Sequence, residues 1–400
     1  MNEYHLLLLL AIGYLVFAID KKQTYFPVPV VLVIIGILLS VIPFFYDVMI
    51  TKEMLFTFFL PALLFISAYQ FSSKAWQRSK YIIITLGTIG LFLTVGLLGI
   101  FIYTVANWFV PLSLLAALLI AAVLAPTDPV SVVAILKQAS RDEEISEIVE
   151  GESMLNDGTS IVVLGVLLQM YTQNTGFNFI EFVNEFLLVS FGGAAIGILF
   201  GWIMSKAIYY TDHWQYQVML SIIVAYGSFY LGELIGVSGV LSTITAGMML
   251  SYEFGKTIEE KEFRRQLDGF WGIVEPTILS IIFLLIGIQA ATYLTFSEWL
   301  FAIAIFIGTL LVRFIVIIII TQLQPTWKKT ISVKDCGIIT WAGIKGTMSI
   351  ALVLGLKATL GNDEMLLFAL IFVTILLSLV VQSAGVYPMM KKLQQKEKRV

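Results

Sequence analysis

Cysteine, histidine and charge are all scarce in this chain of 400 residues. The single cysteine, Cys336, excludes an intramolecular disulfide, and the two histidines, His5 and His213, are too far apart in sequence to form a metal motif. Charged residues make up 13% of the chain, about half the share that is usual in soluble domains. The composition argues against a disulfide-stabilised secreted domain, a histidine-based metal centre and a soluble enzyme.

Hydrophobic residues take the place of the missing charge. They make up 59% of the chain, the mean hydropathy is +0.93, and apolar stretches long enough to cross roughly 30 Å of hydrocarbon recur throughout. This pattern predicts an all-α polytopic membrane protein with about 13 transmembrane helices, give or take one. The predicted spans cover residues 4 to 19, 26 to 44, 54 to 71, 81 to 105, 111 to 137, 150 to 172, 181 to 208, 215 to 235, 236 to 252, 268 to 288, 297 to 321, 335 to 357 and 364 to 390.

Loop charges predict the orientation, because lysine and arginine gather on the cytoplasmic side of membrane proteins. When loops are assigned to alternate sides, one side collects 20 of these cations and the other only Lys52 and Lys357. We therefore expect a plasma-membrane protein with its N-terminus outside and its C-terminus in the cytoplasm. No loop is long enough for a soluble domain, so residues 1–390 are predicted to form one transmembrane domain, followed by a short basic tail at 391–400.

Two predicted spans contain residues that interrupt a helix. In the fifth span, prolines flank Asp128 and remove backbone donors, which leaves carbonyls free beside Asp128 and Thr127. In the twelfth span, glycines lie on both sides of Lys345. Interrupted helices at related positions predict two inverted repeat units, at about 81–172 and 297–390, which is the layout of secondary transporters with a site at the membrane midplane.

The sixth span brings carboxylates into the membrane, where a charge is costly and usually functional. By the rise of an α-helix, Asp157 reaches the same depth as Asp128 and Lys345. Ser153 lies four residues before Asp157, so both share one helical face. Glu152 and Asn156 have the same spacing on the adjacent strip of that helix.

Such a face offers oxygen ligands that suit a hard monovalent cation such as Na⁺. A buried carboxylate can hold either a cation or a proton, and competition for one site is enough to couple the two ions. The sequence therefore predicts cation and proton transport with Asp157 at its centre. We expect no cofactor beyond the transported ions and no enzymatic reaction.

Several segments of the chain resemble the monovalent cation:proton antiporter family 1, which contains the bacterial NhaP-type sodium/proton antiporters and the animal sodium/proton exchangers. The Glu-Ser-x-x-Asn-Asp element at 152–157 is the most specific of them. The resemblance covers about residues 25 to 390 and is carried by Ala125 to Val130, Glu150 to Asp157, Leu231 to Leu250, Phe283 to Ile288 and Trp341 to Gly346.

The resemblance implies an inverted-repeat fold with two crossed, interrupted helices, a homodimer, and alternating access. It implies that Asp157 binds the ion and the proton, with Asn156 as the neutral partner associated with electroneutral exchange. Thr127, Asp128 and Ser153 would line or support the site, so a bound Na⁺ would be held by Asp157, Asp128 and Ser153. Glu152 would form a supporting ion pair with Lys345.

Two positions depart from the family pattern. Ile66 stands where many relatives carry an acid, so the preference for Na⁺ over K⁺ or Li⁺ is open. Lys345 stands where the motif usually carries arginine, and a lysine can lose its proton when buried. Electroneutral exchange is therefore an expectation rather than a deduction.

Other interpretations of these residues remain. Asp128 and Asp157 could cap broken helix ends, and Glu152 with Lys345 is better explained by structure than by transport. Arg313, inside the eleventh span, is left out of the site. K⁺/H⁺ or Li⁺-tolerant antiport is the nearest alternative function. A cation channel is more remote, because broken helices in two inverted units and a buried acid–base cluster favour a carrier. An intramembrane aspartyl protease is also remote, because the chain lacks a Gly-x-Gly-Asp element.

Overall fold

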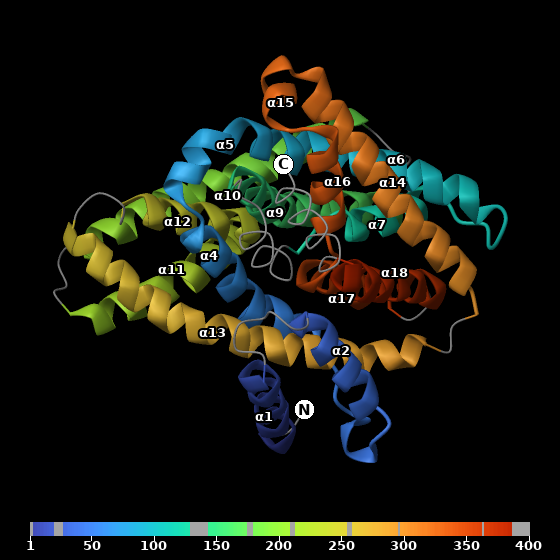
Figure 1. Cartoon of the computed structure of the whole chain (residues 1–400), viewed down its shortest axis with the longest axis horizontal. Helices are drawn as coiled ribbons and strands as arrows, with labels where there is room; N and C mark the ends of the chain where they lie inside the picture. Colours follow the sequence, from blue (N-terminus) through green and yellow to red (C-terminus); the bar gives the residue numbers. More distant parts are fainter. Residues whose placement is uncertain are drawn as a thin grey trace, which may run out of the picture. The chain divides into compact units, whose positions relative to one another are not determined.

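The structure is a computed structural model of the whole chain. It describes residues 3–19, 27–128, 143–173, 179–208, 213–253, 258–294, 297–361 and 364–385. These residues form helices, and the bridge between Asp128 and Ile344 is the one strand-like pairing among them. The predicted all-α fold is confirmed (Figure 1).

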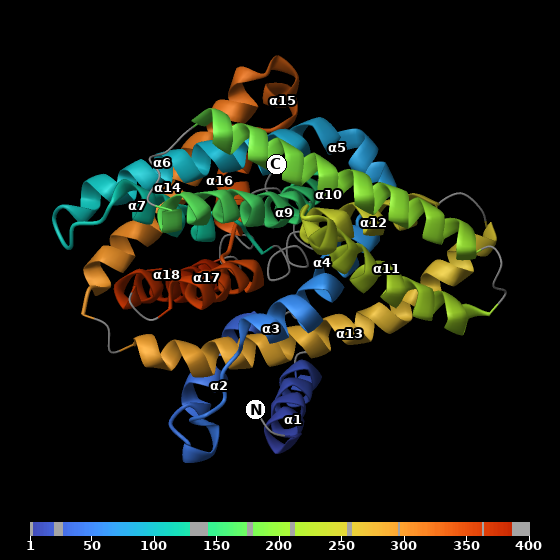
Figure 2. The same cartoon turned by 180° about the vertical axis from the view of Figure 1, so that it is seen from behind.

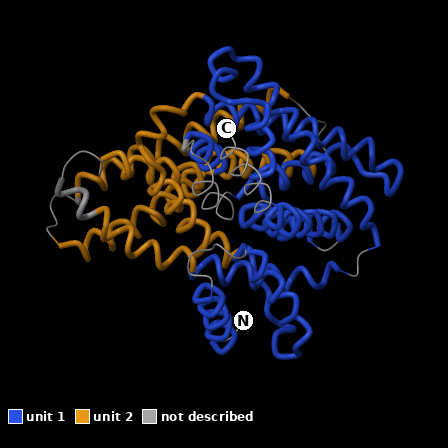
Figure 3. Tube along the Cα trace, viewed as in Figure 1, with its two compact units in different colours: residues 1–52, 82–153, 277–400 blue, residues 53–81, 154–276 orange. Residues whose placement is uncertain are grey.

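The chain divides into two compact units (Figure 3). The first consists of Met1–Lys52, Ile82–Ser153 and Thr277–Val400, and the second of Glu53–Tyr81 and Met154–Pro276. The division between Lys52 and Glu53 falls inside the short helix α3 (Lys52–Met54), and the other three divisions fall inside longer helices, each of which supplies residues to both units. These are α5 (Ser73–Thr85), α9 (Glu143–Gln173) and α13 (Ile258–Ala290). The predicted single domain and its inverted repeats stay predictions.

In the first unit, helix α14 packs against α6, α16 and α18, while α17 lies beside α18 in both views (Figures 1 and 2). In the same unit, the rings of Tyr293 in η4 and Phe372 in α18 are stacked. The helical elements that lie wholly within this unit are α1 (Glu3–Ile19), α2 (Val28–Leu39), η1 (Pro43–Phe45), η3 (Leu86–Gly90), α6 (Leu91–Ala106), α7 (Leu114–Leu124), η4 (Ala291–Tyr293), α14 (Trp299–Leu323), α15 (Pro325–Thr330), α16 (Val333–Ala342), α17 (Thr347–Leu360), α18 (Met365–Leu377) and η5 (Ser378–Gln382).

In the second unit, α12 (Gly239–Glu253) is the central helix and packs against α10 (Phe179–Ile208), α11 (Trp214–Ile235) and α4 (Leu60–Gln70). A short helix, α3 (Lys52–Met54), precedes the π-helix η2 (Leu55–Phe59), which leads into α4. The hydroxyls of Tyr226 and Tyr230 donate hydrogen bonds of 2.7 and 3.0 Å to the carbonyls of Phe58 and Thr57. Side chains of α11 thus bind carbonyl groups of the π-helix.

Helical residues occur in each of the 13 predicted spans. Within the described ranges, eight helical stretches are long and apolar enough to cross a membrane, and α1, α2, α7 and α17 are shorter apolar helices. The number of crossings and the orientation of the termini therefore stay predictions. Residues 129–137 of the fifth span and the tail at 391–400 lie outside the described residues.

Candidate functional site

The fifth span is interrupted where its prolines predict. Helix α7 begins after Ser113, whose hydroxyl accepts a hydrogen bond of 3.1 Å from the Ala116 N–H. It ends at Leu124, because Pro126 has no N–H to donate and restricts the residue before it. The chain then leaves the helix, and the Asp128 N–H donates a hydrogen bond of 2.8 Å to the Ile344 carbonyl.

The twelfth span is interrupted at the glycines on both sides of Lys345. Helix α16 begins with a capping box between Ser332 and Asp335 and ends at Ala342, and helix α17 starts only at Thr347. A Cβ at Gly346 would overlap the carboxylate of Asp128, so glycine is needed for that acid to come close. The two interrupted segments therefore meet at the Asp128–Ile344 bridge, which confirms the predicted breaks.

Each break supplies the charge that the other break needs. The Lys345 ammonium donates hydrogen bonds of 3.3 Å to the carbonyls of Ala125 and Pro126, just beyond the C-terminal end of α7. The Asp128 carboxylate accepts hydrogen bonds from the Thr347 N–H at 3.1 Å and the Thr347 hydroxyl at 3.2 Å, at the first residue of α17. A cation at a helix C-terminus and an anion at a helix N-terminus both interact favourably with the helix dipole. The charges of Lys345 and Asp128, which are 3% and 5% exposed, are thus compensated.

Neutral side chains of the π-helix η5 hold the end of α16. The Ser378 hydroxyl accepts a hydrogen bond of 2.9 Å from the Lys345 N–H, and the Gln382 amide donates to the Trp341 carbonyl at 3.0 Å. The Trp341 indole in turn donates to the Gln382 carbonyl at 2.9 Å. Sequence reasoning missed Ser378 and Gln382. Their spacing of four residues within an apolar span was the available signal, since two buried polar groups on one helical face need partners.

The supporting ion pair has a different cation from the predicted one. Glu152 was paired with Lys345, but the structure gives it the guanidinium of Arg313, with Nη1–Oε1 and Nη2–Oε2 distances of 2.9 and 2.7 Å. Both side chains are buried, and a parallel two-bond geometry is the strongest arrangement for such a pair. Arg313 is the sole charged residue of α14, and a lone cation in a 25-residue apolar helix was the missed signal.

Other predicted site residues lie along α9 and at the α7 break. The hydroxyls of Thr127 and Ser153 are 2.9 Å apart and buried. Asn156 and Asp157 follow Ser153 by about one turn of α9 and belong to the second unit. Asn156 is buried, while Asp157 is partly exposed. In the second unit, Ile66 is a buried apolar side chain of α4.

The donor types available here suit a monovalent cation better than a divalent one. Among the side chains that the structure describes, no group of three or more histidine, cysteine, aspartate or glutamate residues is arranged to hold a metal ion. The hydroxyls of Thr127 and Ser153 are neutral oxygen donors, whereas the carbonyls released at the α7 break accept hydrogen bonds from Lys345. A single carboxylate among such donors matches a charge of +1.

Comparison with known proteins gives the family. The model of the family described as "Sodium/hydrogen exchanger, transmembrane" matches residues 7–392. The Na⁺/H⁺ antiporter NhaG of Bacillus atrophaeus is 31% identical over 95% of this chain and 73% of its own length. The Na⁺/H⁺ antiporter NhaH of Halobacillus dabanensis is 29% identical over 97% of each chain. The structure of the sodium proton antiporter MjNhaP1 from Methanocaldococcus jannaschii superposes with a TM-score of 0.75 at 20% identity over 98% of each chain, which shows the same fold. The chain therefore belongs to the transmembrane sodium/hydrogen exchanger family.

Proposed function

We propose that the protein is a secondary antiporter that exchanges Na⁺ for H⁺ across the plasma membrane, and that both ions compete for Asp157. The relatives NhaG and NhaH are named Na⁺/H⁺ antiporters, and the residues that carry the family resemblance are present. The observation that carries the proposal is the reciprocal capping of two interrupted helices by Asp128 and Lys345. It brings the polar backbone of two helix breaks and two compensated charges into a buried region, and this supports a site of the midplane type.

Asp128, Glu152 and Asp157 differ in their exposure, and we infer different roles for them. Asp128 and Glu152 are buried and hydrogen-bonded to a helix N-terminus and to Arg313, respectively. An exchanging carboxylate must be reached by ions and water, and Asp157 is partly exposed. We assign ion exchange to Asp157 for this reason, with Asn156 as its neutral neighbour. The hydroxyls of Thr127 and Ser153 are the predicted neutral ligands, and Asp128 remains a predicted ligand as well as a cap.

Competition of Na⁺ and H⁺ for one carboxylate gives electroneutral exchange by alternating access. The transporter is proposed to act as a homodimer with its C-terminus in the cytoplasm. K⁺/H⁺ exchange is the second candidate, because the buried Ile66 supplies no carboxylate at a position where many relatives carry one. With fewer charged ligands, discrimination between cations rests on the size of the site and on its neutral oxygens.

The test is ion exchange in proteoliposomes, monitored with a pH-sensitive dye after addition of Na⁺, K⁺ or Li⁺. We expect Na⁺-dependent proton movement in the wild type and none in Asp157→Asn. Glu147→Gln, which also neutralises a partly exposed acid of α9, is the matched control and should retain exchange. A clamped membrane potential should leave the rate unchanged if exchange is electroneutral. Full activity of Asp157→Asn would refute the assignment, and a larger K⁺ signal than Na⁺ signal would favour the second candidate.

A further inference from the structure

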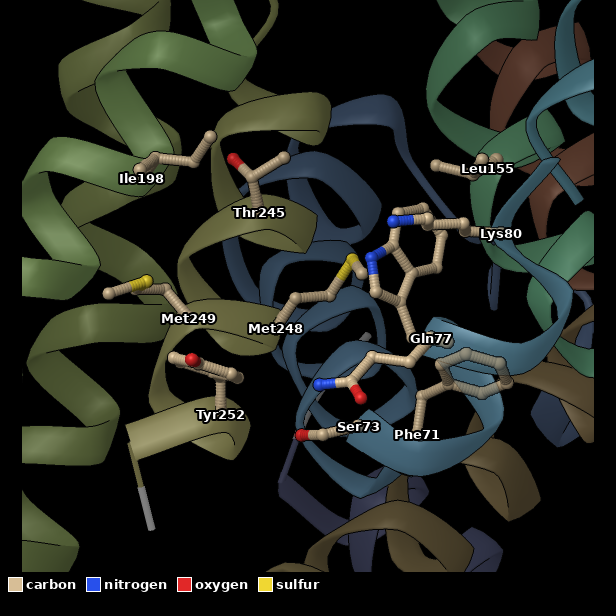
Figure 4. Close-up of a pocket in the computed structure, with 11 residues that line it drawn as sticks. Phe71, Ser73, Gln77, Lys80, Leu155, Ile198, Thr245, Met248, Met249 and Tyr252 are labelled. Atoms are coloured by element: carbon tan, nitrogen blue, oxygen red, sulfur yellow. The ribbon is translucent and has the colours of Figure 1, made fainter. Parts of the chain in front are cut away.

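A cavity of about 440 Å³ lies within the second unit, and none of the residues assigned to ion exchange lines it (Figure 4). Its walls come mainly from the beginning of α5 and the end of α12, with Ile198 of α10 and Leu155 of α9 completing them. This volume is within the range of sites that hold small amphipathic molecules. The cavity therefore needs an explanation separate from ion exchange.

Two helix faces with the same spacing form opposite walls. Helix α5 contributes residues 73, 76, 77 and 80, and helix α12 contributes residues 245, 248, 249 and 252. Each set follows the i, i+3, i+4, i+7 pattern of one helical face. The cavity is thus built by two regular helices rather than by irregular loops.

The α5 wall is polar and carries a positive charge. It presents the Ser73 hydroxyl, the Gln77 amide and the Lys80 ammonium. The Lys80 ammonium lies 5.3 Å from the centre of the Tyr81 ring, and within the described ranges no carboxylate forms an ion pair with it. A cation beside an apolar cavity, without an acid of its own, favours an anionic group in that cavity.

The α12 wall is apolar and adaptable. Met248 and Met249 are unbranched thioethers that adjust to irregular shapes, while the buried ring of Phe71 adds apolar surface from the chain just before α5. The Thr245 hydroxyl donates to the Leu241 carbonyl at 2.8 Å, so it is satisfied within its own helix. This wall suits a hydrocarbon chain.

The third wall faces the surroundings of the protein. Ile198 is 50% exposed, and only 22% of an 18-residue apolar stretch of α10 is buried inside the protein. An exposed apolar helix face in a membrane protein contacts lipid. Trp76 and Tyr252, which also line the cavity, are of the residue types that gather at membrane–water interfaces. A molecule that enters from this side comes from the bilayer.

We propose that this cavity binds one anionic glycerophospholipid. Its phosphate lies at Lys80, with Ser73 and Gln77 as further donors, and an acyl chain lies against Met248 and Met249. The apolar wall accepts any phospholipid, and the Lys80 charge selects lipids with a net negative headgroup. The proposal does not depend on which ions the protein exchanges.

The test reconstitutes the protein in nanodiscs that contain equal amounts of phosphatidylglycerol and phosphatidylcholine. The protein is then extracted in mild detergent, and the retained lipid is quantified by mass spectrometry. We expect wild type to retain phosphatidylglycerol in preference to phosphatidylcholine. Lys80→Gln should lower the retained phosphatidylglycerol about fivefold, which corresponds to the usual contribution of one lysine near a membrane surface. Met248→Trp, which fills the cavity, should lower retention of both lipids.

Lys74→Gln is the matched control, because Lys74 is an exposed cation of the same helix and does not line the cavity. It should keep the wild-type retention. All variants are compared only as monodisperse protein, and a variant that fails this check is replaced by Lys80→Met or Met249→Trp. Equal losses in Lys74→Gln and Lys80→Gln, or no preference in wild type, would overturn the proposal. A change of oligomeric state in Met248→Trp with unchanged lipid retention would overturn it too, by assigning this face to a second copy of the chain.

Discussion

The two helix breaks of the first unit present the same problem and have different solutions. At the α7 break, the freed carbonyls of Ala125 and Pro126 bind an ammonium, that of Lys345, from the other break. At the α16–α17 break, the carboxylate of Asp128 caps the start of α17, but neutral side chains of η5 hold the end of α16. The first break is capped by one long-range charge, whereas the second combines a charge with a neutral network.

The two breaks differ because a charge stabilises a helix end only where no like charge lies nearby. The positive charge of Lys345 lies at the negative C-terminal end of α7, and the negative charge of Asp128 lies at the positive N-terminal end of α17. Both interactions with the helix dipoles are favourable, so the two residues stabilise both breaks together. The end of α16 lies close to the guanidinium of Arg313. The two are so near that a Cβ added at Gly343 would overlap Arg313 Nε. A second cation there would be repelled, and a neutral amide satisfies the carbonyls without that cost.

The largest effect is expected from removing the cation beside the second break. Arg313→Gln leaves Glu152 as a buried charge without its guanidinium, and loss of one partner of such a pair costs roughly 3–5 kcal/mol. We expect a clear drop in the unfolding temperature, measured in detergent by intrinsic fluorescence. The double variant Glu152→Gln/Arg313→Gln should recover most of it. Equal unfolding temperatures for wild type and Arg313→Gln would mean that the pair contributes little.

A smaller loss is expected from removing the cap of the first break. Lys345→Met deprives two buried carbonyls of their donor, which costs about 3 kcal/mol. Lys357→Met is the matched control on α17, because Lys357 is partly exposed and its contact with the Tyr293 hydroxyl contributes less than about 1 kcal/mol. Thermal unfolding of the two variants side by side measures the difference. Similar losses of stability in the two variants would show that the buried Lys345 stabilises the protein no more than the partly exposed Lys357 does.

The neutral network should cost less again. Gln382→Leu leaves the Trp341 carbonyl without its amide donor, for a loss of about 2 kcal/mol. Because Ser378 of η5 also accepts a hydrogen bond from the Lys345 N–H, we expect Gln382→Leu to change the pH profile of ion exchange as well as the stability. The control is Gln322→Leu, because Gln322 is a partly buried glutamine of α14 whose amide also donates to a backbone carbonyl, that of Ile331. A stability loss without any change in the pH profile would restrict Gln382 to a structural role.

The smallest effect on stability is expected from a substitution at Asp128. The same substitution tests whether Asp128 acts as a helix cap or as an ion ligand. Asparagine accepts the same hydrogen bond from the Thr347 N–H and caps helices about as well as aspartate, so Asp128→Asn should cost less than about 1 kcal/mol. If Asp128 acts chiefly as a cap, exchange in proteoliposomes persists in Asp128→Asn and is lost in Asp157→Asn. Loss of exchange in a stable Asp128→Asn protein would make Asp128 an ion ligand.

The sequence predicted the helices and their interruptions well, because both rest on local chemistry. Proline at 126 and glycines at 343 and 346 disfavour a continuous helix, and α7 and α16 end, and α17 begins, within two residues of them. The pairing of charges was predicted less well. The family resemblance implied that Glu152 pairs with Lys345, but neither a motif nor the depth of a residue says which of several helices at one level are neighbours.

Several residues of the candidate site were invisible to motif reasoning. Ser378 and Gln382 act through partners at the end of α16 and in the break that follows it, and nothing in the sequence of α18 or η5 identifies Trp341 or Lys345 as those partners. The cavity at Lys80 is similar. The spacing of residues 73 to 80 is visible in the sequence, but its meeting with residues 245 to 252 of α12 is a tertiary fact.

The sequence by itself determined the class of protein, the all-α fold, the two breaks and the motif that carries Asp157. These depend on hydropathy, on the backbone limits of proline and glycine, and on the cost of a charge in hydrocarbon, all of which act at short range. Only the tertiary structure decided that Lys345 caps α7, that Asp128 caps α17 and that Arg313 binds Glu152. A buried charge must find a partner, but the distance between two side chains on different helices is set by packing.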